Sequence, residues 1–296
     1  MTMMQERAAT RVGRQAAGDA SPSTAAHGRV GGRPHRRSRG IVFSFLLTAA
    51  SLAFWTGLIV ALWEWARLSG AVPSFILPAP SAVWGEFWAE IADGSLLSNA
   101  GVTLQEACAG FGVAAVVAAV SGYAIVHNRV AEAIATPFIG ASQAVPVVAV
   151  APLIVLLVGT GLPPKVIVCA VIVVFPLLIG VITGLRGVAR DYHDVARVFG
   201  ASPLQTLWYV DLPLAAPSLL AGGRVGLTLS LTGAIVGEFV SADSGLGSAI
   251  QTAVGNAQKA PAFAALLALV IISIALFGLI TLIERLVLQW LDAVPS

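Results

Sequence analysis

Several long stretches of the sequence contain no charged side chain, and this pattern limits the possible folds more than any other feature. These stretches run over residues 41–63, 107–126, 133–164, 166–185 and 262–283. A helix of about 20 residues matches the roughly 30 Å hydrocarbon core of a bilayer, because each residue adds about 1.5 Å. Only 11% of the residues are charged, whereas a soluble domain carries about a quarter. The pattern therefore excludes an ordinary soluble enzyme and predicts an all-α membrane protein.

A sixth span is predicted over residues 217–240, although this segment carries two charges. Arg224 and Glu238 are 14 positions apart, or roughly 21 Å along a helix, so each side chain can reach one edge of the membrane. The first span, predicted over 41–66, is longer than the apolar core of a signal peptide, which has about 7–15 residues, and we expect it to stay uncleaved. The expected architecture is a polytopic protein with six transmembrane helices, the last five forming a core over 101–291.

Positive charge is concentrated in the first 40 residues, which hold eight arginines against one aspartate and one glutamate. Most other residues of this 1–40 segment are small or polar, so it is predicted to be a disordered tail. A nucleic-acid-binding arm would share this charge, but a tail held on the cytoplasmic side is the favoured interpretation, and no nucleic-acid partner is expected. With both termini in the cytoplasm, 14 of the 17 basic residues lie inside, and Arg67, Lys165 and Lys259 lie outside. The positive-inside rule thus predicts a multi-pass protein of a bacterial plasma (inner) membrane.

The segment 67–100 is external in this orientation. Pro80 lies near the start of a stretch that carries Trp84, Phe87 and Trp88. Aromatic residues in such a stretch predict a short amphipathic helix that lies along the membrane interface.

The segment 186–216 is too long for a simple connector between two spans and contains clear helix-end signals. Gly200 can adopt the left-handed conformation that ends a helix. Ser202 can cap a second helix, and Gln205, three positions later, completes a capping box. Pro213 is expected to end that second helix. These signals predict a rigid pair of short helices on the cytoplasmic face.

The second of these helices has an apolar face, made by Leu204, Leu207 and Trp208 at helical spacing. Such a face can pack on the bilayer or on the underside of the protein itself. It can equally dock a cytoplasmic partner. The residues alone leave both interpretations open.

Three short motifs follow one another in this loop: Asp-Val-Ala at 194–196, Gly-Ala-Ser at 200–202 and Val-Asp-Leu-Pro at 210–213. Further motifs, such as Leu-Pro-Ala-Pro at 77–80 and Gly-Leu-Gly at 245–247, extend the pattern over most of the chain. Together they resemble the EAA loop and its surroundings in the permease subunits of bacterial ABC importers. The similar branch includes permeases for nitrate, taurine, aliphatic sulfonates and pyrimidine-type vitamin precursors. The first glutamate of the family's loop motif is here an aspartate, which keeps the charge on a shorter side chain.

This resemblance implies a fold, partners and a mechanism. The fold would be the MetI-like transmembrane domain of a type I ABC importer. Two permease copies, expected to form a homodimer, would enclose the pathway, and two separate ATPase subunits would bind ATP and Mg, so that this chain binds no cofactor. A separate extracytoplasmic binding protein would deliver the solute. By the same resemblance, the residues that couple the loop to the ATPase are Asp194, Ala196, Gly200, Ala201, Ser202, Leu204 and Leu207.

The sequence contains no catalytic or metal-binding pattern. A P-loop needs a lysine in a GxxxxGKS/T turn, and neither Lys165 nor Lys259 fits it. The patterns HExxH, CxxC and GxSxG are also missing. His127 and His193 are interpreted as loop residues and not as metal ligands. The chain is therefore expected to be a transport subunit and not an enzyme.

Polar residues and prolines interrupt the 133–164 span near its middle. Such residues are tolerated at this depth mainly where they are packed in protein or line a cavity. Ser142, Gln143 and Pro146 are therefore predicted to belong to the translocation pathway.

The leading hypothesis is the permease of an ATP-driven importer for a small polar or anionic solute. The alternative is an ion-coupled secondary transporter that works without an ATPase, with Glu106 or Glu238 as a proton-coupling group. The favoured interpretation of both acids is interfacial, capped by water or backbone. A membrane scaffold would explain the loop but not the interrupted span.

Overall fold

The computed structural model describes residues 37–70, 72–73, 76–142, 146–241 and 243–293. Of the predicted 1–40 tail, residues 1–36 therefore lie outside the described residues. The chain divides into two units, 1–58 and 59–296, and every contact discussed below lies within the second unit.

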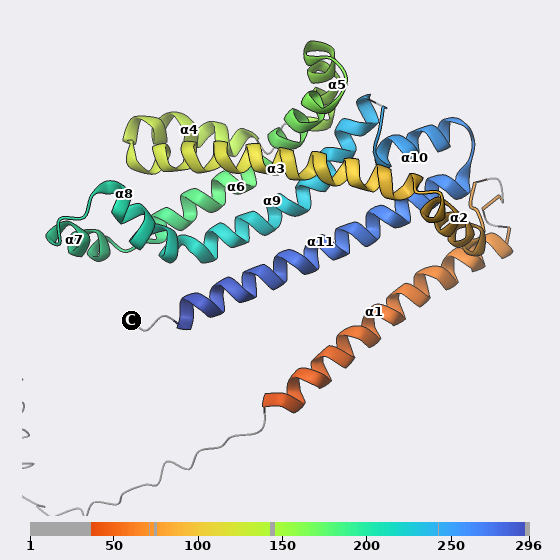
Figure 1. Cartoon of the computed structure of the whole chain (residues 1–296), viewed down its shortest axis with the longest axis horizontal. Helices are drawn as coiled ribbons and strands as arrows, with labels where there is room; N and C mark the ends of the chain where they lie inside the picture. The colour runs from red at the N-terminus through yellow and green to blue at the C-terminus, as the bar shows by residue number, and fades with distance from the viewer. Residues whose placement is uncertain (1–36, 71, 74–75, 143–145, 242, 294–296) are drawn as a thin grey trace, which may run out of the picture. The chain divides into compact units, whose positions relative to one another are not determined.

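Every regular element in the described part of the chain is a helix (Figure 1). In chain order they are α1 (Arg37–Leu68), α2 (Pro80–Ala92), α3 (Ser95–His127), α4 (Arg129–Ser142), α5 (Val147–Val158), α6 (Leu162–Gly187), α7 (Arg190–Val198), α8 (Pro203–Thr206), the π-helix η1 (Leu207–Asp211), α9 (Leu212–Ser241), α10 (Leu246–Gly255) and α11 (Lys259–Ala293). Lipid offers no hydrogen-bond partners, so an apolar segment that crosses it must satisfy its backbone internally, as a helix does. The predicted all-α class is confirmed.

Four stretches of the described chain are long and apolar enough to cross a membrane. They are Ser95–His127, Leu162–Gly187, Pro203–Ser241 and Lys259–Gln289. A fifth span results if α4 and α5 together form one broken span. The polytopic membrane fold is thus confirmed. The predicted first span falls within α1, and the total of six spans stays a prediction.

The helices α3, α6 and α9 run side by side and form the centre of the second unit (Figure 1). A Cβ atom on Gly180 would lie 3.0 Å from the Cα atom of Gly222, so α6 and α9 touch backbone to backbone. A Cβ atom on Gly110 of α3 would overlap with the side chain of Cys169 in α6. Because lipid tails are as apolar as the side chains, helices in a membrane are held together by such close packing.

The two ends of this three-helix centre carry different elements (Figure 1). α7 and α8 lie at one end, which we call the loop end, whereas α2 and α10 lie at the other, which we call the α10 end. α2 begins at Pro80 and is amphipathic: Phe87 is buried, and Trp84 and Trp88 are exposed. α3 begins at Ser95, twelve residues before the charge-free stretch 107–126 from which this span was predicted.

Candidate functional site

The turn between α7 and α8 has the predicted left-handed conformation. Gly200 has a φ angle of +73°, which L-residues with a side chain rarely adopt. Its N–H donates to the carbonyl of Arg197, and the N–H of Ala201 donates to the carbonyl of Ala196, both at 3.0 Å. These two bonds close the end of α7 in the manner of a Schellman motif. The prediction that Gly200 ends this helix is confirmed.

The capping box of the second helix is also present. The N–H of Gln205 donates to Ser202 Oγ at 3.3 Å, and the N–H of Ser202 donates to Gln205 Oε1 at 2.8 Å. Pro203 occupies the first helical position, where its missing N–H costs nothing. The loop is therefore held in shape by its own side chains at this point.

The predicted end of the helix at Pro213 is wrong. α8 continues through η1 into α9, and the N–H of Leu212 donates to the carbonyl of Leu207, five residues back. A proline lacks the N–H and its ring clashes with the carbonyl four residues earlier in a regular helix. The wider π-turn directly before Pro213 opens the spacing at this point, so the chain stays helical. As a result the loop leads into a membrane-spanning helix with no flexible joint.

A hydrogen bond ties the first helix of the loop to the π-helix. His193 Nε2 lies 2.8 Å from Oδ1 of Asp211, which is buried. Both predicted loop histidines are helical, since His193 lies in α7 and His127 ends α3. The two partners are 18 positions apart and share no periodic pattern, so sequence reasoning did not find this contact.

Large apolar side chains of the loop are exposed. Val198 and Phe199 are each 85% exposed, and Leu204, Trp208 and Tyr209 are exposed as well. The predicted coupling residues Asp194, Ala196, Gly200, Ala201, Ser202, Leu204 and Leu207 lie in α7, in the turn, in α8 and at the start of η1. Sequence reasoning did not single out Val198 and Phe199 as exposed apolar residues, and their position directly before the glycine that ends α7 is the signal that could have found them.

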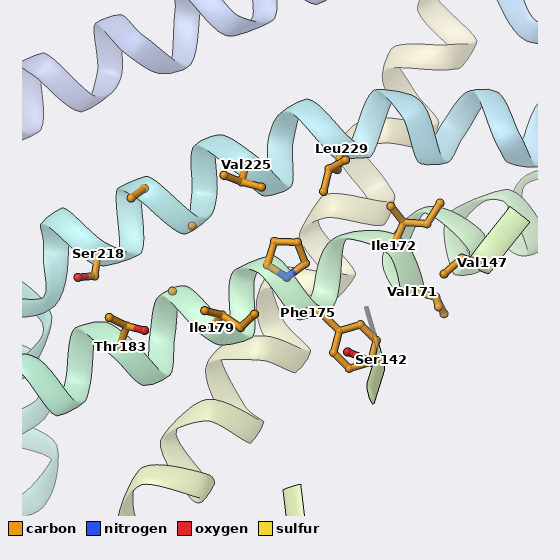
Figure 2. A pocket seen from close by; sticks show the side chains of 14 residues that line it. Ser142, Val147, Val171, Ile172, Phe175, Ile179, Thr183, Ser218, Val225 and Leu229 are labelled. Carbon is orange, nitrogen blue, oxygen red and sulfur yellow. The ribbon is translucent and has the colours of Figure 1, made fainter. Parts of the chain in front are cut away.

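A cavity of about 700 Å³ lies between α6 and α9 near the α4–α5 interruption (Figure 2). Its lining consists of Ser142, Val147, Val171, Ile172, Phe175, Pro176, Ile179, Gly180, Thr183, Ser218, Ala221, Gly222, Val225 and Leu229. Of the predicted pathway residues, Ser142 is part of this lining, Pro146 precedes α5 outside it, and Gln143 lies outside the described residues.

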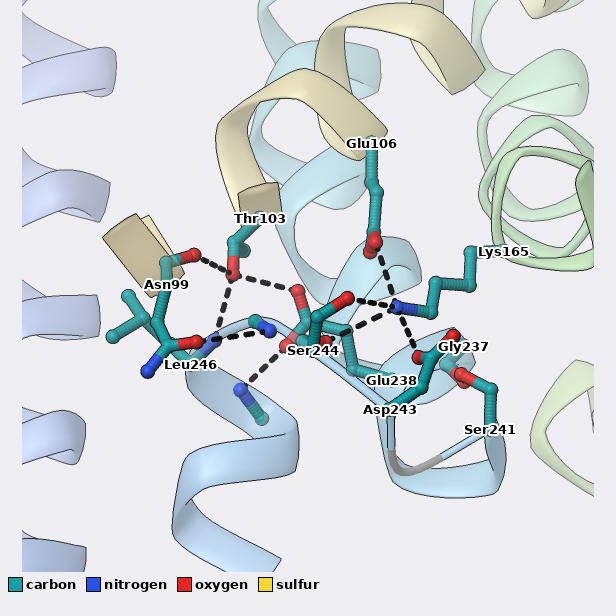
Figure 3. Close-up of polar contacts among 12 residues, drawn as sticks. Asn99, Thr103, Glu106, Lys165, Gly237, Glu238, Ser241, Asp243, Ser244 and Leu246 are labelled. Carbon is teal, nitrogen blue, oxygen red and sulfur yellow. Dashed lines mark hydrogen bonds and ion pairs between the residues drawn. The ribbon is translucent and has the colours of Figure 1, made fainter. Parts of the chain in front are cut away.

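A buried ion cluster lies toward the α10 end (Figure 3). Lys165 Nζ donates to Glu106 Oε1 at 2.8 Å and to Asp243 Oδ1 at 2.6 Å, and it also contacts the carbonyl and hydroxyl of Ser244 at 3.1 and 3.2 Å. Lys165 was expected in an external loop, but it lies in α6 with its side chain 1% exposed. A buried ammonium of this kind is tolerated because it is fully paired.

Glu238 binds the start of α10 in the same region (Figure 3). Its Oε1 accepts from Thr103 Oγ1 at 2.6 Å, and its Oε2 accepts from the N–H of Gly247 at 2.5 Å. Gly245 has a φ angle of +103°, and a Cβ atom there would overlap with the carboxyl group of Glu238. Glu106 and Glu238 are thus buried among protein groups. The expected backbone cap is present on Glu238, which accepts from the N–H of Gly247, whereas Glu106 pairs with the Lys165 side chain.

Asp243 lies after the end of α9 and its pKa is lowered from its ordinary value of 3.8. Partial burial works to raise this pKa, but the hydrogen bond from the Lys165 ammonium and its positive charge outweigh that effect. Asp243 is therefore held in its charged form as the outer partner of the cluster.

The fold and these sites define a class of protein: a polytopic membrane permease with a structured helical loop at one end of its spanning core. The chain belongs to the family described as "Binding-protein-dependent transport system inner membrane component", which it matches over residues 110–289. Members are the permease subunits of ABC transporters and not enzymes, and ATP hydrolysis belongs to a separate ATPase. Membership implies an ATPase and a binding protein as partners and a multi-pass inner-membrane location.

The relatives are named for different solutes. The chain is 42% identical to the riboflavin transport system permease protein RibX of Chloroflexus aurantiacus, over 79% of this chain and 87% of that one. It is 29% identical to the putative aliphatic sulfonates transport permease protein SsuC of Bacillus subtilis, over 87% of this chain and 91% of that one. An inward-facing structure of the MetNI methionine ABC transporter matches with a TM-score of 0.57 at 20% identity, covering 67% of this chain and 98% of that chain. The last likeness concerns the fold alone, and it agrees with the predicted MetI-like architecture.

Proposed function

We propose that two copies of this chain form the transmembrane pathway of an ATP-driven importer for a small solute, and that the 186–216 loop is the contact with the ATPase. The observation that carries this proposal is the loop itself, which is rigid and yet exposes large apolar side chains. The relatives named for riboflavin and for aliphatic sulfonates support a small solute delivered by a separate binding protein. The basic residues of the loop support a cytoplasmic position for it and for both termini.

The exposed apolar side chains of the loop support a protein partner. Val198 and Phe199 lie beside a turn that is closed by backbone hydrogen bonds, so they cannot easily fold back onto the protein. Covering apolar surface is worth about 25 cal/mol per Å². A groove on an ATPase that receives this end of α7 would gain that free energy at a low ordering cost, because the loop is already structured.

The π-helix supports a mechanical role for the loop. η1 joins α8 to α9 without an interruption, and the His193–Asp211 hydrogen bond holds α7 against this joint. α9 in turn touches α6 at Gly180 and Gly222, beside the cavity. A displacement of the loop by the ATPase is therefore passed along α9 to the walls of the cavity.

The cavity supports an importer more than an ion-coupled carrier. None of its lining residues in the described part of the chain is charged, and both buried glutamates contact Lys165, Thr103 or backbone groups instead. An ion-coupled carrier needs a protonatable or ion-binding group at the site that alternates between the two sides. We therefore assign Ser142 to the pathway of an importer from its place in the lining, and we keep Gln143 and Pro146 as pathway residues on the sequence argument alone.

Co-purification in mild detergent tests the coupling role. The chain is expressed with its ATPase as wild type, as Gly200→Pro and as Phe199→Glu. Proline cannot adopt the positive φ of Gly200, and it also removes the N–H that closes α7. Both variants are expected to lose the ATPase.

Gly94→Pro is the matched control. Gly94 has a φ angle of +83°, a Cβ atom on it would lie in open space, and it donates its N–H to Ile91 much as Gly200 donates to Arg197. It directly precedes α3, at the opposite end of the fold (Figure 1). Retention of the ATPase by Gly200→Pro and Phe199→Glu would refute the coupling role, and a wild-type chain that captures no ATPase would favour the ion-coupled carrier.

A further inference from the structure

We propose that the cavity between α6 and α9 receives an uncharged, flat ring compound with hydrogen-bonding groups, and that it selects against small anions such as nitrate or a sulfonate. This inference rests on the proposed function, because it takes the cavity to be part of the solute pathway. It narrows the solute from the sequence-based expectation of a polar or anionic compound to a neutral one.

Among the described residues, the lining of the cavity carries no charge that could receive an anion. Its polar side chains are three hydroxyls, on Ser142, Thr183 and Ser218, and the other lining residues are aliphatic, glycine, proline or phenylalanine. An anion that leaves water for such a site loses its hydration without gaining a cation or a set of charged donors, which costs several kcal/mol or more. A neutral solute pays only for its polar groups, and hydroxyls can compensate those.

The arginine that precedes a lining residue of α9 is paired with α11. Arg224 directly precedes the lining residue Val225, but its guanidinium pairs with Glu284 at 2.5 Å, approaches Thr281 at 3.2 Å and lies over the ring of Phe277. All three of these partners belong to α11, on another side of α9. The arginine therefore contributes no charge to the lining.

The other basic residues of the central helices are also engaged. The Lys165 ammonium is surrounded by Glu106, Asp243 and Ser244, and Arg186 pairs with Glu132 at 2.6 Å. Neither residue is part of the lining. Arg186 lines a smaller neighbouring cavity with Ile179 and Thr183, where its charge is already paired with Glu132. An anion in the cavity between α6 and α9 would thus meet no unpaired positive side chain in the described lining.

The shape and the placement of the hydroxyls fit a flat ring. A cavity of about 700 Å³ is far larger than an inorganic anion needs and lies in the range of about 300–1,000 Å³ that is usual for drug-sized ligands. Gly180 and Gly222 leave a wall without side chains where the two helices touch, and Phe175 supplies an aromatic face. Figure 2 shows Thr183 of α6 and Ser218 of α9 toward one end of the cavity, with Ile179 between Thr183 and the region of Phe175.

The two hydroxyls at that end are free to bind a solute. Thr183 and Ser218 make no hydrogen bond to another residue in the described part of the chain, whereas Ser142 Oγ donates to the carbonyl of Ile139 at 2.7 Å. A ring with polar atoms along one edge can place them against Thr183 and Ser218 and its faces against the apolar wall. This arrangement gives one orientation to a neutral heterocycle.

Direct binding to the permease in lipid nanodiscs tests the inference without the selection made by a binding protein. The neutral probes are riboflavin and nicotinamide, and the anionic probes are nitrate and pentanesulfonate, each measured by equilibrium dialysis. We expect a neutral ring probe to bind and neither anion to compete with it. Thr183→Val and Ser218→Ala should each weaken that binding about fivefold, the equivalent of one hydrogen bond, and Phe175→Leu should weaken it because the aromatic face is lost.

Thr228→Val is the matched control, because Thr228 is an exposed threonine of α9 outside the lining. Binding of an anion, absence of binding by both ring probes, or ring binding that Thr183→Val and Ser218→Ala leave unchanged would each overturn the inference. ATPase capture by the same preparations separates the two proposals. Captured ATPase without ring binding refutes only the solute class, whereas loss of capture refutes the importer itself.

Discussion

Replacing Lys165 with methionine should destabilise the fold by about 3–5 kcal/mol, the usual cost of removing one partner from a buried ion pair. The Lys165 ammonium is 1% exposed and has acceptors from Glu106, Asp243 and Ser244 between 2.6 and 3.2 Å away. Methionine keeps the apolar stem but leaves the Glu106 carboxylate without its cation. Oε2 of Glu106 is already buried without a hydrogen-bond partner, so the lost cation adds to an existing deficit.

Thermal unfolding in one fixed detergent measures this effect. A loss of 1 kcal/mol lowers Tm by about 2–4 °C for a domain of about 150–250 residues, so Lys165→Met should lower Tm by roughly 10 °C. The double variant with Glu106→Gln should recover part of this loss, because the unpaired carboxylate is then gone. The coupling between the two positions in a double-mutant cycle is the specific signature of the pair.

Arg186→Met is the control for losing a cation as such. Its ion pair with Glu132 is about half exposed, and exposed pairs contribute about 0–1 kcal/mol. If Lys165→Met lowered Tm no more than Arg186→Met, or if Glu106→Gln made the loss larger, the reasoning from burial and pairing would be refuted.

Three further outcomes follow from the same structure. Gly245→Ala should destabilise the fold by more than about 1 kcal/mol, because φ is +103° and the new Cβ would overlap with the Glu238 carboxyl group. Gly94 also has a positive φ but faces open space, so Gly94→Ala should lower Tm clearly less. Equal losses of Tm in the two variants would contradict the steric argument. Wild type should have a higher Tm than Asp243→Asn above pH 3.8, and this difference in Tm should disappear as the pH falls through the lowered pKa of Asp243. The reason is that the Asp243 carboxylate must stay charged to hold Lys165. A difference that grows in acid would contradict this linkage. Asp211→Leu should retain the ATPase in co-purification but lower the solute uptake per ATP hydrolysed in proteoliposomes severalfold. The reason is that the His193–Asp211 hydrogen bond, which holds α7 against η1, is lost. Unchanged uptake would show that this hydrogen bond takes no part in coupling.

The local features of the candidate site could be predicted from the sequence because each depends on neighbours in the chain. The left-handed turn at Gly200 and the box of Ser202 with Gln205 involve residues within three to five positions of each other, and the structure has both. The end predicted at Pro213 was wrong because a proline breaks only a regular helix, and a π-turn directly before it changes the geometry. The coupling and pathway roles of the predicted site residues stay predictions.

The sequence by itself determined that the chain is a helical membrane protein, because long charge-free stretches can be stable in lipid only as helices that satisfy their own backbone. It could not determine which charges meet. Glu106, Lys165 and Glu238 lie on three different helices, and their burial depends on how α3, α6 and α9 pack. Lys165 looks like an external charge in the sequence because it lies between the charge-free stretches 133–164 and 166–185, at an outer end in the predicted orientation. Only the tertiary structure places the carboxylates of Glu106 and Asp243 next to it, and this pairing makes a buried charge stable.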